Sequence, residues 1–405
     1  MKDKIKFLPL LFYYGIVVLV LYSNDFWGDE GRYIMYAKNL LNGYYSPLDD
    51  VYLWNGPGYP IVLVPFVFLK LPWLTAKLLN ALFLFIAMMY FYRTLRLYIK
   101  ESLSFSFTYI LGIYPPFLRH IHQLVTESLS VFLVCGFLFY FCKAHKDKSI
   151  SWAHLLASSF FLGYLALTKI FFGYVILTGL LLYLFLYLWN KRLSFKKTFL
   201  IYLLALIFCL PYLFYTNSLT GKIYFWGNSG GMSWYWMSSP NENELGDWQW
   251  TKKVIENPQL YEKHQAFFKR IKNLSNLQQD DEFRKRAIEN IINHPSKYLK
   301  NVAANVGRLL FNYPYTHYNQ KLSTYFFIIP NMFVVVFFVV SFYPAFLGRR
   351  LIPHEVYSML LFGLVALGGS SLLSAYNRQL WPLVPVFMLW ISFVISNILK
   401  VEIKK

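Results

Sequence analysis

Acidic side chains are scarce in this chain, and two of them stand next to each other near its start. Asp29 and Glu30 occur in the stretch F-W-G-D-E-G-R-Y, just after the first apolar run. A carboxylate there can accept a proton as a general base. It can equally cap the helix that follows, where an acid also suits the helix dipole. The residues alone leave both roles open for Asp29.

Four further charged side chains lie within mainly apolar stretches. They are Arg119, Glu127, Lys169 and Arg378. A charge in such a setting is costly, so its position carries information, although a charged head at a membrane interface can reach water at modest cost. As a set, cations in a partly dry cleft suit an anionic ligand, and carboxylates beside them can accept a proton.

The composition indicates an integral membrane protein. Of 405 residues, 57% are hydrophobic and 15% are charged, whereas a soluble domain carries about a quarter charged residues. Apolar runs long enough to cross a bilayer recur, which predicts an all-α membrane protein with several spans. The formal net charge of +19 does not indicate nucleic-acid binding, because the basic residues form short clusters between the apolar runs.

These basic clusters predict the topology. If all of them are cytoplasmic, as the positive-inside rule indicates, each stretch between neighbouring clusters crosses the bilayer an even number of times. The stretch lengths fit about ten transmembrane helices, with both termini in the cytoplasm of a plasma (inner) membrane. The clusters are Lys2/Lys4/Lys6, Arg93/Arg96/Lys100, Lys143/Lys146/Lys148, Lys191/Arg192/Lys196/Lys197, Arg349/Arg350 and Lys400/Lys404/Lys405.

The topology divides the chain into three parts. Residues 1–216 are an N-terminal transmembrane bundle whose first external loop, residues 23–76, carries the acidic pair. Residues 217–323 are a small external domain, and residues 324–405 return as C-terminal transmembrane helices. Within the first loop, apolar spacing predicts an amphipathic helix over 30–41 at the membrane surface. The stretch 60–71 is short and proline-rich and is expected to be interfacial or re-entrant.

All the candidate charges fall on the non-cytoplasmic side in this threading, together with His120 and His122. The two histidines are not at the i,i+4 spacing of a helical metal site, and Arg119 beside them would repel a cation. We therefore expect no metal site and no required cofactor. Arg32 and Lys38 are expected to face lipid headgroups.

An ordered series of stretches resembles a known family. G-D-E-G-R-Y-I-M-Y-A-K-N-L-L-N-G-Y-Y, followed by N-G-P-G-Y-P-I-V-L-V-P-F, is similar to the first external loop of GT-C fold glycosyltransferases. The likeness is to the protein O-mannosyltransferase and aminoarabinose transferase group (glycosyltransferase family 39-like). Further matches are T-E-S-L at Glu127, L-A-L-T-K at Lys169, T-G-K-I-Y-F-W-G-N-S-G-G, A-I-E-N-I-I-N-H-P-S-K-Y-L-K-N-V-A-A-N-V-G-R-L-L, and Y-N-R-Q-L-W-P-L-V-P at Arg378.

The resemblance implies an inverting enzyme that takes a sugar from a polyprenyl- or dolichyl-phosphate donor at the external membrane face. Asp29 is then the base, and Glu30 a neighbour with a structural or acceptor-orienting role. Glu127 lines the acceptor side, although as the first residue of a span it could equally serve as a helix-dipole partner. His122, Tyr376 and Tyr59 are further candidates for the pocket lining.

The donor phosphate site stays open. Some family members carry a lysine just before the first-loop proline, whereas this chain has the stretch Asn55-Gly56-Pro57. Arg378, Lys169 and Arg119 are therefore all candidates. The acceptor, a hydroxyl or phosphate of an envelope lipid, glycan or protein, is not specified. The alternative function is a transporter or flippase for a lipid-linked saccharide, although no internal repeat supports it.

Overall fold

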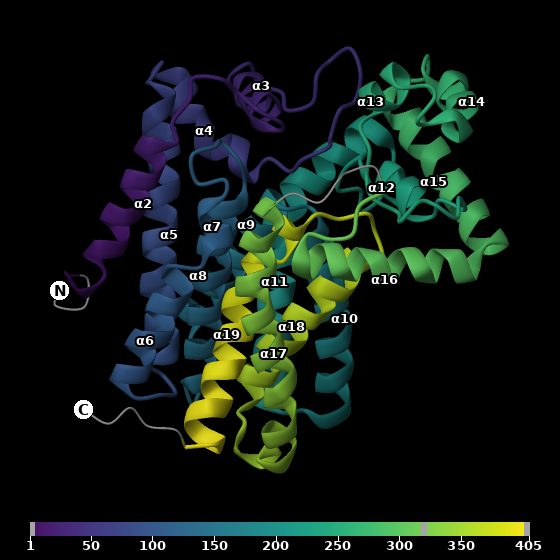
Figure 1. The fold of residues 1–405 in the computed structure, drawn as a ribbon. Coiled ribbons are helices and arrows are strands. Elements are labelled where there is room, and N and C mark those ends of the chain that lie inside the picture. Colours follow the sequence, from purple (N-terminus) through teal and green to yellow (C-terminus); the bar gives the residue numbers. More distant parts are fainter. Residues whose placement is uncertain (1–4, 317–321, 401–405) are drawn as a thin grey trace.

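The computed structural model describes residues 5–316 and 322–400. The predicted basic residues Lys2, Lys4, Lys404 and Lys405, and residues 317–321 of the predicted external domain, lie outside the described residues. The described parts of the chain are helical and contain no strand, which confirms the all-α class. Figure 1 shows a bundle with α3 and α12–α15 above one end, while α19 ends at the opposite end.

Each of the ten predicted membrane-spanning stretches contains a helix. Among the described residues, six are long and apolar enough to cross a bilayer: α5 (Trp73–Leu95), α8 (Glu127–Lys146), α10 (Phe171–Asn190), α11 (Leu193–Thr220), α17 (Tyr325–Leu347) and the stretch Asn377–Ile398. This last stretch comprises η3 (Asn377–Gln379), η4 (Trp381–Leu383), α19 (Val384–Phe393) and η5 (Val394–Ile398). The other four are α2 (Leu8–Val20), α6 (Glu101–Gly112), α9 (Trp152–Thr168) and α18 (His354–Ser371). The chain is a multi-pass membrane protein, and ten crossings stay a prediction.

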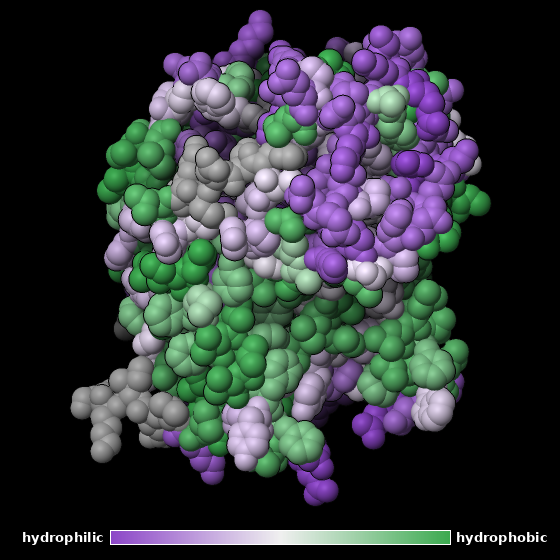
Figure 2. Space-filling view, turned by 45° about the vertical axis from the view of Figure 1, so that its right-hand side comes forward, coloured by the Kyte–Doolittle hydropathy of each residue, from purple (hydrophilic) through white to green (hydrophobic). Residues whose placement is uncertain are grey.

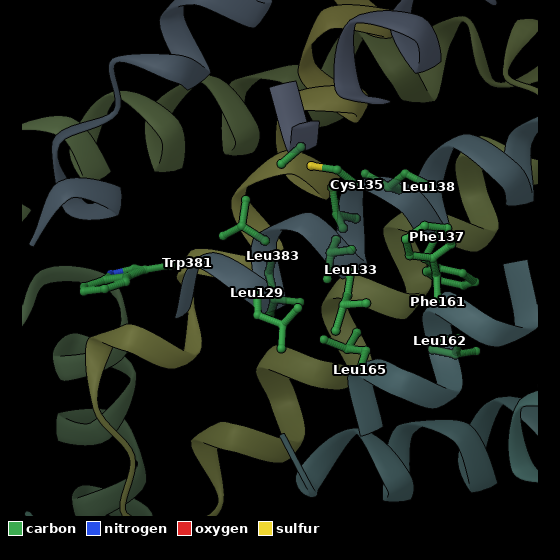
Figure 3. Packing of buried hydrophobic residues seen from close by; sticks show 14 of the residues in the cluster. Leu129, Leu133, Cys135, Phe137, Leu138, Phe161, Leu162, Leu165, Trp381 and Leu383 are labelled. Carbon is green, nitrogen blue, oxygen red and sulfur yellow. The ribbon is translucent and has the colours of Figure 1, made fainter. Parts of the chain in front are cut away.

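Helix α8 lies at the centre of the bundle, between α5, α9, α18 and α19. Its sequence is apolar on all sides, as a helix surrounded by others requires. Gly136 lets α9 approach closely, because a side chain there would collide with the ring of Phe161. Figure 3 shows Phe161, Leu162 and Leu165 of α9 in the same buried cluster as Leu129, Leu133 and Phe137 of α8. Between helices in lipid such packing, rather than escape from water, holds the bundle together.

The first loop contains α3 (Glu30–Leu41) and α4 (Gly58–Phe68). The predicted helix over 30–41 is confirmed with the same bounds. Its apolar face packs against the protein, where Tyr33 meets Tyr59 of α4 edge to face with ring centroids 5.3 Å apart. This contact fixes the start of α3, and hence the acidic pair, relative to α4.

The segment after α11 forms its own small core. It contains α12 (Gly230–Met237), α13 (Thr251–Glu256), α14 (Glu262–Ile271), α15 (Asn276–Asn293) and α16 (Pro295–Phe311). Ser275 and Gln278 form a capping box that begins α15, and buried aromatic rings such as Tyr235 and Phe283 pack α12 against α15. The short elements α7 (Pro115–Leu118), η1 (Leu322–Thr324) and η2 (Arg349–Leu351) complete the described chain. The domain boundaries at 217 and 323 stay predictions, and α11 continues to Thr220.

The surface agrees with a membrane setting. On the face shown in Figure 2, hydrophilic residues gather in the upper right, hydrophobic residues cover most of the lower half, and scattered hydrophilic residues lie at the bottom edge. Large apolar side chains of α17, such as Phe333 and Val340, are exposed on the outside of the bundle. In water an apolar surface of this extent would be unfavourable, whereas in lipid it is solvated.

Candidate active site

A cavity of about 280 Å³ lies where the first loop, the α9–α10 junction, the α12–α16 region and the segment after α18 meet. Four of the predicted site residues line it: Asp29, Lys169, Tyr376 and Arg378. They come from three parts of the chain that are distant in sequence.

A glycine allows the first loop to reach the α9–α10 junction. A Cβ atom added to Gly56 would lie 2.0 Å from the carbonyl oxygen of Leu167, near the end of α9. Only a residue without a side chain permits this approach. The close contact brings the loop next to Lys169, which directly follows α9.

Asp29 occupies the N-cap position of α3, but its side chain makes no capping hydrogen bond. Its carboxylate is buried and instead forms ion pairs with Arg32 and Arg378. Arg378 Nη2 donates to Asp29 Oδ2 at 2.8 Å. The side-chain capping interpretation is therefore wrong, because two guanidinium groups offer stronger partners than the helix end.

The same pairs set the protonation of Asp29. Burial raises the pKa of its carboxyl, but the positive charges of Arg378 and Arg32 outweigh burial and hold the pKa below its ordinary value. Asp29 is thus ionised at neutral pH. Ionisation is what a proton acceptor needs, although a lowered pKa weakens it as a base.

Glu127 lies behind the cavity wall, where it pairs with two cations. Lys169 Nζ is 3.2 Å and Arg378 Nη1 is 3.8 Å from Glu127 Oε1. Its other oxygen, Oε2, is buried without a hydrogen-bond partner among the described residues. As the first residue of α8, Glu127 also suits the helix dipole. It is not among the residues that line the cavity, so its predicted acceptor-side role stays a prediction.

The charges around the cavity do not cancel. Arg32, Lys169 and Arg378 face two carboxylates, those of Asp29 and Glu127. The surplus positive charge lies in a partly buried setting, where electrostatic attraction is stronger than in bulk water. An anion such as a phosphate would be bound favourably here.

Arg32 is a site residue that the sequence analysis missed. Its prediction as a lipid-facing side chain is wrong, since Arg32 lines the cavity. Its guanidinium donates to Asn55 Oδ1 at 2.6 Å and to the Tyr52 hydroxyl at 2.9 Å, and lies 5.1 Å from the Trp54 ring. The i,i+3 spacing of Asp29 and Arg32 at the start of a helix was the signal that could have revealed the pair.

Glu30 faces away from the cavity. Its side chain is fully buried and accepts hydrogen bonds from the backbone N–H groups of Trp27 and Leu124, both at 2.8 Å. Lys77 Nζ lies 3.8 Å away. Glu30 thereby joins the first loop to α5 and to the segment before α8, an arrangement that holds its neighbour Asp29 in place.

Three other predicted residues do not line the cavity. Arg119 is exposed, His122 is half-buried, and Tyr59 is buried behind Tyr33. Within the described residues, no group of three or more metal-ligating side chains lies together.

Asn305 of α16 fixes the segment that carries Arg378. Its amide nitrogen donates to the carbonyl oxygens of Ser370, Ser371 and Leu373 over 2.6–3.2 Å. Its oxygen accepts from the backbone N–H of Ala375 at 3.2 Å. One buried side chain thus holds the end of α18 and the turn that leads to Arg378. An asparagine in an amphipathic helix gives no sequence signal of such a role.

The chain resembles known proteins in sequence and in fold. Residues 67–215 match the family model described as dolichyl-phosphate-mannose-protein mannosyltransferase, a range that includes Glu127 and Lys169 but not Asp29 or Arg378. The archaeal oligosaccharyltransferase AglB from Archaeoglobus fulgidus, solved with an inhibitory peptide and a dolichol-phosphate, superposes with a TM-score of 0.54 over 96% of this chain. The chain has the GT-C fold.

The likeness to solved GT-C proteins is one of fold, because sequence identity to AglB is 14%, and the chain spans half the length of the AglB chain. ArnT from Cupriavidus metallidurans bound to undecaprenyl phosphate also matches, with a sequence identity of 14% and a TM-score of 0.45. The match covers 96% of this chain and 77% of the ArnT chain. No curated protein sequence matches the chain.

Proposed function

We propose that the chain is an inverting membrane glycosyltransferase that moves a sugar from a polyprenyl-phosphate (or dolichyl-phosphate) donor to an acceptor at the non-cytoplasmic face. One observation carries the proposal: a buried carboxylate, Asp29, lies in contact with the cationic group of Arg378 in a cavity of surplus positive charge. The mannosyltransferase family match and the GT-C fold support a lipid-phosphate-linked donor.

Arg378 and Lys169 bind the donor phosphate in this proposal. The acceptor hydroxyl attacks C1 of the sugar from the side opposite the phosphate, and its proton passes to Asp29. The bond between C1 and the phosphate oxygen breaks, and the phosphate leaves with the electron pair. The cations stabilise the charge that develops on it. A phosphate leaves readily without a proton, so the two-carboxylate arrangement of glycoside hydrolases is not needed.

Donor binding strengthens the base. When the donor phosphate takes hydrogen bonds from Arg378, Asp29 loses part of the charge that lowers its pKa. Its pKa then rises, and Asp29 becomes a better proton acceptor only while the donor is present. The resting ion pair thus limits unproductive proton transfer.

The proposed orientation follows the positive-inside rule, with both termini cytoplasmic and the cavity on the opposite side. It is supported by the position of α3 and α12–α15 at the end of the bundle opposite the end of α19 (Figure 1).

A transfer assay tests the proposal. The purified chain in lipid nanodiscs is given a panel of polyprenyl-phosphate sugars with lipid, glycan and peptide acceptors, and the release of free polyprenyl phosphate is measured. We expect acceptor-dependent release with at least one donor. Movement of an intact donor between leaflets without cleavage would instead support the transporter alternative.

A further inference from the structure

Four aromatic side chains form one side of the cavity. This aromatic wall consists of Trp54, Trp248, Trp250 and Tyr376. The rings of Trp248 and Trp250 are 4.7 Å apart, and Trp54 and Tyr376 lie 6.1 Å and 6.3 Å from Trp248. The first loop, the α12–α16 region and the segment after α18 each contribute to the wall.

The rings of the aromatic wall are not fully buried. Trp250 is 43% exposed, and the other three rings are half-buried. Aromatic surface that faces an open cavity is unfavourable in water and marks a place where a ligand binds. The C–H groups on one face of a pyranose ring offer a flat apolar surface that fits such rings.

Two residues that line the cavity carry buried polar atoms without a hydrogen-bond partner among the described residues. These atoms are Ser370 Oγ and Ser374 Oγ. Buried polar groups without partners are rare and require an explanation. A ligand with hydroxyl groups would satisfy the two serine hydroxyls once these turn toward the cavity, whereas a hydrocarbon chain would satisfy neither.

The wall adjoins the base. Arg32 lies 5.1 Å from the Trp54 ring and Arg378 lies 5.7 Å from the Tyr376 ring, and both cations contact Asp29. A molecule on the wall is therefore one side chain away from the proposed proton acceptor. Lys169, which lines the same cavity, binds the donor phosphate in the proposed function.

We propose that the aromatic wall binds the acceptor, and that the acceptor is a saccharide whose pyranose ring stacks on Trp248 and Trp250. This inference rests on the proposed function and narrows it, because it selects a glycan or a sugar headgroup over a protein. The hydroxyl groups of Ser370 and Ser374 then bind the hydroxyl groups at the edge of the bound sugar.

Saturation-transfer NMR tests the inference on the full chain in nanodiscs prepared without sugar-based detergents. The probes are methyl α-mannopyranoside, methyl α-glucopyranoside, a mannobiose and a capped threonine peptide. We expect saturation at the ring C–H protons of at least one saccharide, and weak or no transfer to the peptide. Trp248→Ala and Trp250→Ala should each weaken saccharide binding about tenfold, the scale of one lost aromatic contact.

The control is Trp189→Ala, because Trp189 is 79% exposed at the end of α10 and outside the wall. Its saccharide affinity should equal that of the unmodified chain. Trp250 is exposed, so its replacement should fold even if that of Trp248 does not. Equal saccharide affinity in Trp250→Ala and Trp189→Ala, no saturation of any saccharide, or preferential binding of the peptide would overturn the inference.

The two proposals fail in different ways. If a saccharide binds through the wall but no donor is cleaved, the aromatic subsite stands and the proposed function fails. If sugar is transferred to the peptide while no saccharide binds, the proposed function stands and the subsite inference fails.

Discussion

Asp29 and Arg378 are 349 positions apart in the sequence, yet Arg378 Nη2 donates to Asp29 Oδ2 at 2.8 Å. One residue begins α3 in the first loop and the other lies in η3, beyond α18. The contact exists only when the N-terminal and C-terminal parts of the chain have folded together. It places the proposed base beside the arginine proposed to bind the donor phosphate, so that donor binding affects the reactivity of Asp29 toward the acceptor.

Replacement of Arg378 by alanine should weaken donor binding. A charge-assisted hydrogen bond to phosphate contributes about 1.5–3 kcal/mol, so the Kd for undecaprenyl phosphate should rise about 10- to 100-fold. Native mass spectrometry or a filter assay in nanodiscs measures the change. Arg119→Ala is the matched control, since Arg119 is exposed and does not line the cavity. An unchanged Kd for Arg378→Ala would show that Arg378 does not bind the phosphate and would leave Lys169 as the proposed binding residue.

The pH profile should respond to Arg32. Because the ionised form of Asp29 is active and its pKa lies below the ordinary value, kcat/KM falls only as the pH drops through that lowered pKa. Arg32→Gln removes one of the charges that lower it, so the acid limb of kcat/KM should move to higher pH. Arg32→Lys keeps the charge and should keep the limb nearer its original position. A limb that stays unmoved in Arg32→Gln would show that another group controls it.

Replacement of Glu30 should lower the stability of the protein rather than remove a group that takes part in sugar transfer. In Glu30→Ala, two backbone N–H groups lose their acceptor and Lys77 loses its neighbouring charge. Breaking a buried pair in this way costs about 3–5 kcal/mol, seen as a lower Tm. The double variant Glu30→Ala/Lys77→Met should recover part of the loss. Abolished transfer by Glu30→Gln with an unchanged Tm would instead assign Glu30 a direct chemical role.

Asn305 should act on Arg378 from a distance. In Asn305→Ala the carbonyls of Ser370 and Leu373 lose their donor, so the segment before Arg378 is no longer fixed. We expect about 2–4 kcal/mol lower stability, at about 1 kcal/mol per hydrogen bond, together with a higher Kd for the donor. Asn301, equally buried one turn earlier, binds Met237 and Ser239 carbonyls instead. Asn301→Ala should lose comparable stability and keep its donor affinity; equal donor loss in both variants would refute a specific link.

Helices could be predicted from the sequence because local pattern determines them. Apolar runs, the spacing over 30–41 and the basic clusters between runs are properties of neighbouring residues, and the structure has a helix in every predicted span. The order of the spans also predicted that Asp29, Lys169 and Arg378 lie on one side of the bundle, because each follows an outgoing span and precedes a returning one.

Side-chain partners could not be predicted in the same way. Asp29 fits the cap rule by position, but its choice of Arg32 and Arg378 over the helix end depends on a contact across the whole chain. Arg119 resembled Arg378 in sequence setting, and only the packing of the turns separates the exposed side chain from the one in the cavity. The aromatic wall needs three segments that no single stretch of sequence connects.

The most direct test of the account is the rate of sugar transfer from a polyprenyl-phosphate donor by purified Asp29→Asn, compared with Asp25→Asn. Asp25 is an exposed acid in the same loop and controls for the change of charge. The account predicts a loss of at least about 100-fold for Asp29→Asn, the scale of a missing general base, with the protein folded and the donor still bound, and full activity for Asp25→Asn. Transfer by Asp29→Asn at the rate of the unmodified chain would contradict it.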